Sequence, residues 1–162
     1  MQAVRVYVGL AQAGTAQERD DVALREMIRQ GGFDWDVLIM ALPIMTGWLD
    51  TSAVDMVEHM HGGNIATIAV QYPYLQSPLA LILETRSGLN QADALIGTVQ
   101  SYWRDLPRDA RPRLYIHGLS RSAWSSMHGT DLFALLGGPI NGAFWAGPPF
   151  PSTMWQGIAK SR

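Results

Sequence analysis

The chain has 162 residues, and its 48% hydrophobic content is enough for one globular domain with a buried core. The 12 Lys and Arg residues against 14 Asp and Glu, with no basic run, exclude an evident nucleic-acid-binding face, so we expect no nucleic-acid partner. The absence of cysteine excludes disulfides, thiolate metal sites and a cysteine nucleophile, and we predict neither a cofactor nor a metal. No apolar run approaches the roughly 18 to 20 residues that cross a bilayer.

The first part of the chain alternates strand patterns with helical ones. Short apolar runs predict strands at residues 3–10, 36–42 and 64–70. Helical spacing predicts one helix over residues 15–30, with Thr15 as N-cap and Gly31-Gly32 as its end. A second helix is predicted from Thr51 or Ser52 to Gly62-Gly63.

The second part continues this alternation after a less regular segment. The conformation of residues 72–87 stays open. The alternatives for 72–83 are a lid, an acyl-binding wall, a segment that contacts a membrane surface, or a core connector. The patterns that follow predict a helix over 90–106, a strand over 113–117, a helix over 123–136 and a strand over 140–146. Residues 147–151, Gly-Pro-Pro-Phe-Pro, are expected to end regular structure.

Strands separated by helices predict an α/β fold, with an open, mostly parallel sheet and helices on both faces. No linker divides the chain, so residues 1–162 are expected to form a single domain. Ligands in such folds bind at the carboxyl ends of the strands. We therefore look for chemistry in the loops after Leu42, Val70, His117 and Ala146.

The strongest local motif is Gly118-Leu119-Ser120-Arg121-Ser122, between a predicted strand and a predicted helix. It is similar to a nucleophile elbow, where small residues flank a serine held on a tight turn. Ser120 is then the nucleophile, and the backbone amide of Arg121 stabilises the oxyanion. Ser122 stands where the pattern has glycine, so we expect looser packing there. The alternative is that Ser120 or Ser122 only caps a helix.

The chain also resembles the α/β-hydrolase catalytic domain found at the C-terminal end of certain bacterial membrane proteins. The resemblance is carried, in the family's order, by Arg5-Val6-Tyr7-Val8-Gly9-Leu10, Thr46-Gly47-Trp48-Leu49-Asp50, His61-Gly62-Gly63, Ala69-Val70-Gln71-Tyr72 with Tyr74-Leu75, Pro112-Arg113-Leu114-Tyr115 and Gly147-Pro148-Pro149. It implies a serine hydrolase whose domain is longer than this chain, so we expect a C-terminally incomplete domain without the final strands. It also implies membrane association only through a missing N-terminal region.

On the α/β-hydrolase plan, the strand over residues 37–42 precedes the oxyanion loop. Gly47 is then the second oxyanion backbone amide, and Thr46 and Trp48 bind substrate. The alternative is an ordinary turn with a core tryptophan.

The histidines elsewhere have simpler readings. His61-Gly62-Gly63 falls at a helix end before a strand, which indicates a C-cap and not an oxyanion motif. Glu58, His59 and His61 point in different directions from a helix, so we expect a solvated helix end there and no metal site.

A catalytic triad is incomplete in this chain. The required order is serine, acid, histidine, but only Asp131 and His128 follow Ser120, and both lie close to it in sequence. His117, inside a predicted strand, is expected to be a packed core residue. We therefore predict a serine hydrolase fragment for a small acyl or ester substrate, with little turnover on its own.

The alternative function is a non-catalytic α/β binding or assembly module. An open sheet edge could then mediate self-association. A nucleotide-binding protein is a weaker alternative, because no predicted strand is followed by a glycine-rich phosphate turn.

Overall fold

The computed structural model describes residues 2–43, 47–71, 80–130, 139–149 and 152–160. Its core is a five-stranded sheet in the order β1-β3-β2-β4-β5, and every neighbouring pair is parallel. The strands are β1 (Val4–Val8), β2 (Val37–Leu42), β3 (Ile65–Val70), β4 (Arg113–Leu119) and β5 (Gly142–Ala146). The predicted open parallel sheet is confirmed.

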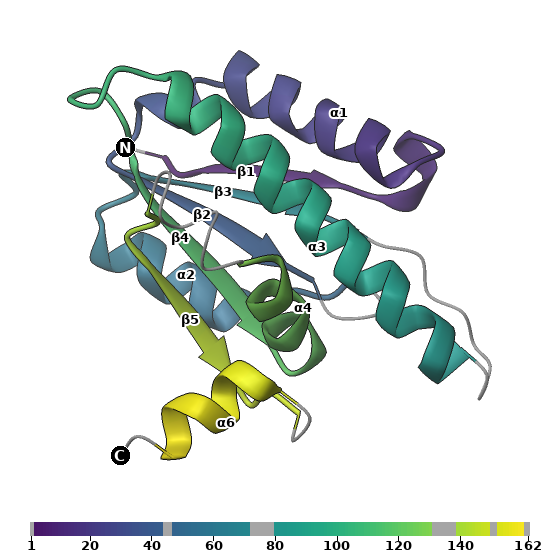
Figure 1. Cartoon of the computed structure of the whole chain (residues 1–162). Coiled ribbons are helices and arrows are strands. Elements are labelled where there is room, and N and C mark those ends of the chain that lie inside the picture. Colours follow the sequence, from purple (N-terminus) through teal and green to yellow (C-terminus); the bar gives the residue numbers. More distant parts are fainter. Residues whose placement is uncertain (1, 44–46, 72–79, 131–138, 150–151, 161–162) are drawn as a thin grey trace.

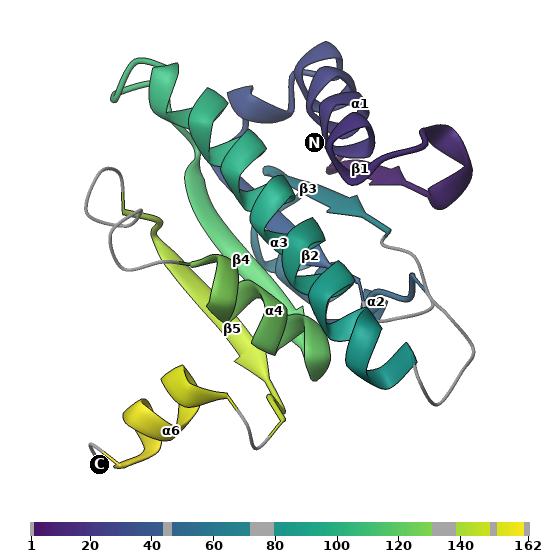
Figure 2. The ribbon, with the colours of Figure 1, turned by 45° about the vertical axis from the view of Figure 1, so that its right-hand side comes forward.

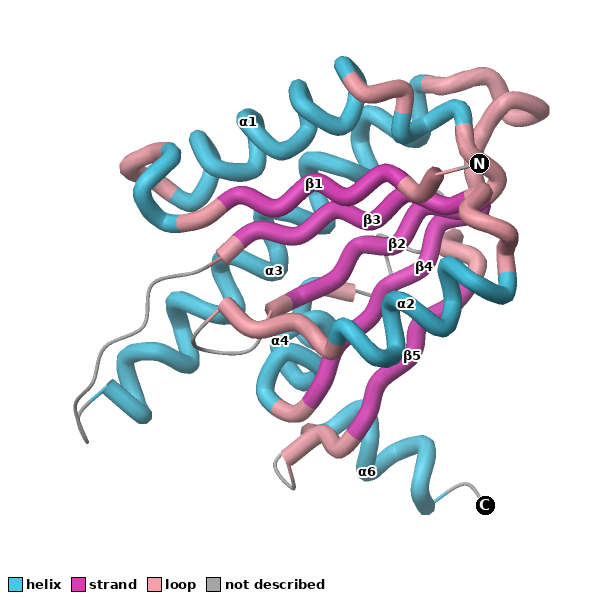
Figure 3. The backbone as a smooth tube through the Cα atoms, turned by 180° about the vertical axis from the view of Figure 1, so that it is seen from behind, coloured by secondary structure: helices cyan, strands magenta, loops and turns pink. Residues whose placement is uncertain are grey.

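Helices lie on both faces of this sheet, as predicted (Figures 1 and 3). One face carries α1 (Ala16–Arg29), α3 (Ala80–Asp105) and α4 (Arg121–Gly129), whereas α2 (Thr51–Met60) lies on the other. The remaining elements are two short 3-10 helices, Leu10–Gln12 and Gly32–Asp34, and the C-terminal helix α6 (Thr153–Lys160).

Two apolar layers hold these elements together. The larger one packs strand residues such as Leu38, Ile68 and Ile116 against α1 and α3. The smaller one places Ile39 and its neighbours beneath α2. Every residue of β2 and β3 is buried, which explains why these two strands are continuous apolar runs in the sequence.

Local capping decides where the first helices begin and end. The Thr15 hydroxyl accepts a hydrogen bond from the amide of Glu18, and the Glu18 carboxylate accepts one from the amide of Thr15, which confirms the predicted N-cap. At the end of α2, Gly62 and Gly63 have positive φ angles and their amides donate back to His59 and Glu58, so the predicted C-cap is confirmed.

An ion pair fixes α2 to the edge of the sheet. The guanidinium of Arg5 on β1 donates to both carboxylate oxygens of Glu58, at 2.7 and 2.6 Å, and also pairs with Asp55. These contacts raise the pKa of Arg5. The expected solvated helix end is therefore wrong for Glu58, whose carboxylate is engaged by a residue distant in sequence.

Several element boundaries differ from the sequence-based expectations. Helix α3 begins at Ala80, ten residues before the predicted start at 90, while residues 72–79 lie outside the described residues. Strand β4 continues to Leu119 and α4 begins at Arg121, so Ser120 alone joins them. Residues 131–136 of the predicted helix also lie outside the described part.

The expectation that regular structure ends at residues 147–151 is wrong, because α6 follows. Pro148, Pro149 and Pro151 all precede Thr153, the first residue of α6, in the sequence. Proline is compatible with positions near the start of a helix. The amide of Gln156 donates to the carbonyl of Ser152 at 3.0 Å and closes the first turn of α6.

Candidate active site

The order of the strands creates a switch point at the carboxyl ends of β2 and β4. These strands are neighbours, but the chain leaves β2 for α2 on one face and leaves β4 for α4 on the other (Figure 2). Such a switch point is where open α/β sheets bind ligands. Gly47 and Trp48 follow β2 in the chain and Ser120 directly follows β4, so both segments come after the strands at this switch point.

Ser120 has a strained backbone. Its φ and ψ angles are 58° and −118°, and it is the one non-glycine residue with positive φ in the described part of the chain. Strain of this kind costs about 1–3 kcal/mol and persists only where neighbouring structure enforces it. The Ser120 amide donates to the carbonyl of Ala146 on β5 at 2.7 Å, and its carbonyl accepts from the amide of Trp124 in α4 at 3.3 Å.

Gly118 permits the close approach of helix to strand that this turn needs. A Cβ atom at Gly118 would lie 2.8 Å from the Cα and N atoms of Ala123 and from the carbonyl oxygen of Ser122. All three are backbone atoms, which cannot move aside as a flexible side chain could. The glycine two positions before the serine is therefore required by packing.

Ser122 fits into the turn in place of glycine. Its side chain is buried, and its hydroxyl accepts a hydrogen bond from the Leu119 amide at 2.9 Å and donates one to the Leu119 carbonyl at 2.8 Å. The turn accommodates the larger residue through these two hydrogen bonds.

The helix-capping alternative is not what the turn shows. Ser120 occupies the N-cap position of α4, but its side chain makes no capping hydrogen bond. The Ser122 hydroxyl bonds back to Leu119 instead of to the helix amides. The peptide amide of Arg121 belongs to the first turn of α4, the positive end of the helix dipole.

Gly47 lies between two residues from distant parts of the sequence. Its φ angle is 85°, and a Cβ atom there would collide with the Tyr7 hydroxyl and come within 2.7 Å of Nε2 of Gln71. The Tyr7 hydroxyl donates a hydrogen bond of 2.9 Å to the Gly47 carbonyl. Burial raises the pKa of Tyr7 above its ordinary value, at which the phenol is already a protonated donor at neutral pH.

Sequence analysis did not identify Tyr7 and Gln71 as neighbours of the site. Both lie in segments that carry the family resemblance, at the carboxyl ends of β1 and β3. The carboxyl ends of parallel strands meet at one edge of the sheet, so the position of Tyr7 and Gln71 at strand ends is the sequence feature that could have identified them.

The structure does not bring all predicted site residues into contact. Gly47 lies beside Tyr7 of β1 and Gln71, the residue after β3, whereas Ser120 follows β4. Strand β2 lies between β3 and β4 in the sheet. No hydrogen bond joins Gly47 to Ser120 within the described residues. Thr46 lies outside those residues. Trp48 is 49% exposed, so it is not the core tryptophan of the alternative interpretation.

His117 is partly buried on the α2 face and stacks on Phe144, with ring centroids 5.7 Å apart and planes 4° from parallel. Burial lowers the pKa of His117, and the nearby Asp50 carboxylate opposes this effect only in part. The expected core position is thus partly right, since one side of the ring faces a groove. The Asp131 position and the His128 side chain lie outside the described structure.

The described residues contain no group of three His, Asp or Glu side chains placed to hold a metal ion. None of the helices described is long and apolar enough to span a membrane.

Comparison with known proteins agrees with this geometry. A sequence model described as an alpha/beta-hydrolase family matches residues 4–162. No curated protein and no solved structure matches the chain. Because the match extends over nearly the whole chain and the structure has the parallel sheet of that fold, the chain belongs to an alpha/beta-hydrolase family.

Proposed function

We propose that this domain is built for serine-dependent hydrolysis of an ester or related acyl bond, with Ser120 as nucleophile. The observation that carries the proposal is the strained turn at Ser120, between a parallel strand and a helix. This turn lifts a serine above the sheet, in the way a nucleophile elbow does. Nothing else in the described packing explains why a serine occupies this backbone conformation, which glycine would adopt at lower cost.

In the proposed reaction the Ser120 hydroxyl attacks the acyl carbonyl carbon and gives up its proton to a base. The tetrahedral intermediate releases the alcohol, which takes up that proton, and water then hydrolyses the acyl enzyme. The amides of Arg121 and Gly47 are the proposed oxyanion donors. The dipole of α4 supports the Arg121 amide as a donor. The hydrogen bond from Tyr7 holds Gly47 in place.

The proposed substrate is a small ester, with Thr46 and Trp48 as binding residues. The half-exposed indole of Trp48 offers an apolar surface in the loop after β2.

We expect this chain on its own to hydrolyse its substrate very slowly. Within the described residues, no acid or histidine is hydrogen-bonded to the Ser120 side chain. His117 lies three residues earlier on β4, in contact with Phe144. A serine without a base is a poor nucleophile at neutral pH. The same observation favours a second candidate function, a non-catalytic binding or assembly module on the same fold.

A fluorophosphonate probe followed by intact-mass spectrometry tests the proposal. We expect slow, single-site labelling at Ser120, abolished in Ser120→Ala and unchanged in Ser101→Ala, which alters an exposed serine on α3. If Ser120→Ala were labelled as much as the wild-type chain, Ser120 would not be the nucleophile. Labelling as fast as that of a complete serine hydrolase would contradict the proposed low activity, and no labelling at all would favour the non-catalytic module.

A further inference from the structure

Gly47, the proposed second oxyanion donor, has a backbone that only its neighbours can hold still. Its φ angle of 85° lies in the region that favours glycine, and glycine has more backbone freedom than any other residue. Ordering the backbone of one residue costs roughly 1–2 kcal/mol. An oxyanion donor is effective when it is in place before the reaction, because no reorganisation is then needed. The contacts around Gly47 therefore bear on the proposed reaction.

Two side chains restrict different parts of Gly47. The Tyr7 hydroxyl donates to the Gly47 carbonyl and so limits rotation about the Cα–C bond. The side-chain amide of Gln71 fills the space beside the Cα atom, where a Cβ atom would lie 2.7 Å from Nε2 and 2.8 Å from Cδ of Gln71. Gly47 is thus held at its carbonyl by one residue and at its Cα atom by the other.

The sheet places Tyr7 and Gln71 on the same side. Tyr7 lies opposite Ala69 in the ladder between β1 and β3, and Gln71 follows Ala69 by two residues, which returns its side chain to that face. The Gln71 amide donates to the Val8 carbonyl at 2.8 Å, so the ladder continues one residue past β3. Hydrogen bonding in the sheet therefore fixes the backbone from which the Gln71 side chain starts.

The far end of the Gln71 side chain is also anchored. Its Oε1 atom accepts a hydrogen bond from the Leu10 amide at 3.4 Å and would lie 3.6 Å from a Cβ atom at Gly9. The side chain therefore contacts the loop after β1 and the loop after β2, while its own backbone continues β3. One side chain links the carboxyl ends of three strands.

We propose that Gln71 is a positioning residue of the serine-dependent hydrolysis, and that it acts together with Tyr7 by holding the Gly47 amide ready for the oxyanion. This role rests on the proposed function, because it has a catalytic effect only if Ser120 reacts. Gln71 acts through Gly47 and does not bind the reacting atoms. Removing an oxyanion donor outright lowers a rate about 10²–10³-fold, so loosening one should cost less, about tenfold.

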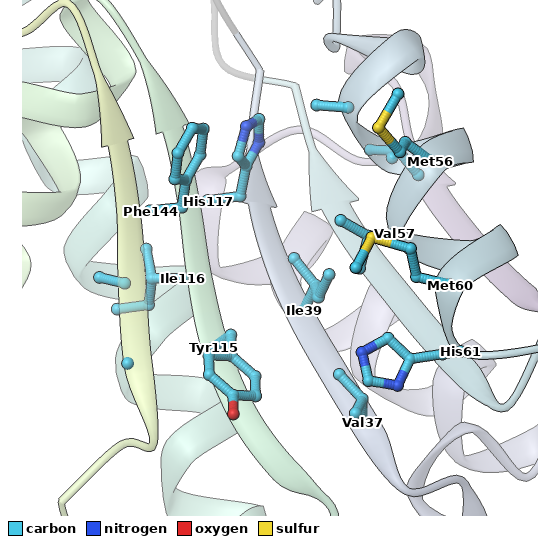
Figure 4. A pocket seen from close by; sticks show the side chains of 14 residues that line it. Val37, Ile39, Met56, Val57, Met60, His61, Tyr115, Ile116, His117 and Phe144 are labelled. Atoms are coloured by element: carbon cyan, nitrogen blue, oxygen red, sulfur yellow. The ribbon is translucent and has the colours of Figure 1, made fainter.

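These contacts are separate from an open apolar groove of about 530 Å³ between α2 and the β4–β5 side of the sheet. Figure 4 shows Met60 of α2 on one side of that groove and Phe144 on the other. None of Tyr7, Gly47 and Gln71 is among the described residues that line it. Met60→Ala, a change in the groove, should therefore leave the oxyanion loop undisturbed.

Fluorophosphonate labelling of Ser120 at several probe concentrations tests the role of Gln71, because it separates the inactivation rate constant kinact from the probe dissociation constant KI. We expect Gln71→Ala to lower kinact about tenfold and to leave KI within about twofold of the wild-type value. A merely structural role would reduce the fraction of folded chain and thus the extent of labelling, but not kinact of the folded chain. Circular dichroism measures the folded fraction.

Gln12→Ala is the matched control. The Gln12 side chain also accepts a hydrogen bond in the loop after β1, from the Gly9 amide, but the side chains nearest to Gly47 are those of Tyr7 and Gln71. Gln12→Ala should therefore keep the wild-type kinact. Gln71→Met, which keeps the length and bulk of the side chain, should recover most of the rate.

Combining Gln71→Ala with Tyr7→Phe tests whether the two residues act together. The combined loss in kinact should be smaller than the product of the two single losses, because both side chains hold one residue. Met60→Ala should show no loss.

Three results would overturn the role of Gln71 while leaving Ser120 as nucleophile. They are an unchanged kinact in Gln71→Ala, an equal loss in Gln12→Ala, and a change in KI alone, which would make Gln71 a binding residue. A wild-type chain that is not labelled at Ser120 would instead overturn the proposed function, and the positioning role with it.

Discussion

The hydroxyl of Tyr7 donates a hydrogen bond of 2.9 Å to the carbonyl oxygen of Gly47 and so joins the edge strand β1 to the loop that follows β2. Strand β3 separates β1 from β2 in the sheet, so the bond passes over a strand. It fixes a loop residue that the proposed reaction uses as an oxyanion donor.

Tyr7→Phe removes this hydrogen bond and keeps the ring. We expect the free energy of unfolding to fall by about 0.5–1.5 kcal/mol, the usual net value of one hydrogen bond. Urea denaturation measures it. The matched control is Tyr102→Phe, whose ring packs on Phe33 and whose hydroxyl has no hydrogen bond among the described residues. Equal losses in the two variants would show that the Tyr7 hydroxyl contributes nothing.

Gly118→Ala tests the packing of α4 against β4. The new Cβ atom would lie 2.8 Å from backbone atoms of Ser122 and Ala123, so we expect a loss of roughly 2–3 kcal/mol, as in an overpacked core. Thermal and urea unfolding give this value. Gly97→Ala is the control, because nothing lies within 4 Å of its added Cβ atom and alanine should stabilise α3 by about 0.5–1 kcal/mol. A neutral Gly118→Ala would mean that the turn is looser than described.

Ser122→Ala removes both hydrogen bonds to Leu119. The half-buried Leu119 then loses the hydrogen-bond partner of its amide and that of its carbonyl, and the expected cost of the two bonds is about 1–3 kcal/mol. Ser126→Ala should cost less, since the Ser126 hydroxyl makes one hydrogen bond, to the Ala123 carbonyl inside α4, and the helix supplies that carbonyl with another partner. Urea unfolding of Ser122→Ala and Ser126→Ala compares the free energies that the two hydroxyls contribute. If Ser122→Ala were the milder change, Ser122 would not stabilise the turn.

His117 should make stability depend on pH. Because burial lowers its pKa, the folded state holds His117 neutral under conditions where the unfolded chain, with a pKa near 6.5, begins to bind a proton. The free energy of unfolding should therefore fall as the pH drops below about 6.5, and the contribution is fully present above that value.

His117→Phe should reduce this acid sensitivity, as measured by urea unfolding at about pH 7.5 and about pH 5.5, on either side of the unfolded-state pKa. His59→Phe, which changes an exposed histidine of α2, should keep the wild-type dependence. An unchanged pH dependence in His117→Phe would assign the effect to other groups.

The sequence alone predicted the elements that form through interactions between residues close together in the chain. Strands β2 and β3 were predictable because burial on both faces requires unbroken apolar runs, and α1 was predictable because Thr15 and Glu18 cap each other within three residues. The turn at Ser120 was recognisable for the same reason, since its strand, small residues and helix are consecutive.

The tertiary structure alone decided what depends on the order of strands in the sheet. Chain order does not specify that β3 inserts between β1 and β2, and without that order neither the Tyr7–Gly47 hydrogen bond nor the Gln71 contact can be inferred. The Arg5–Glu58 ion pair and the groove beside Phe144 arise in the same way, because they join residues that only folding brings together. Periodicity and capping act over a few residues, whereas these contacts arise from packing across the whole sheet.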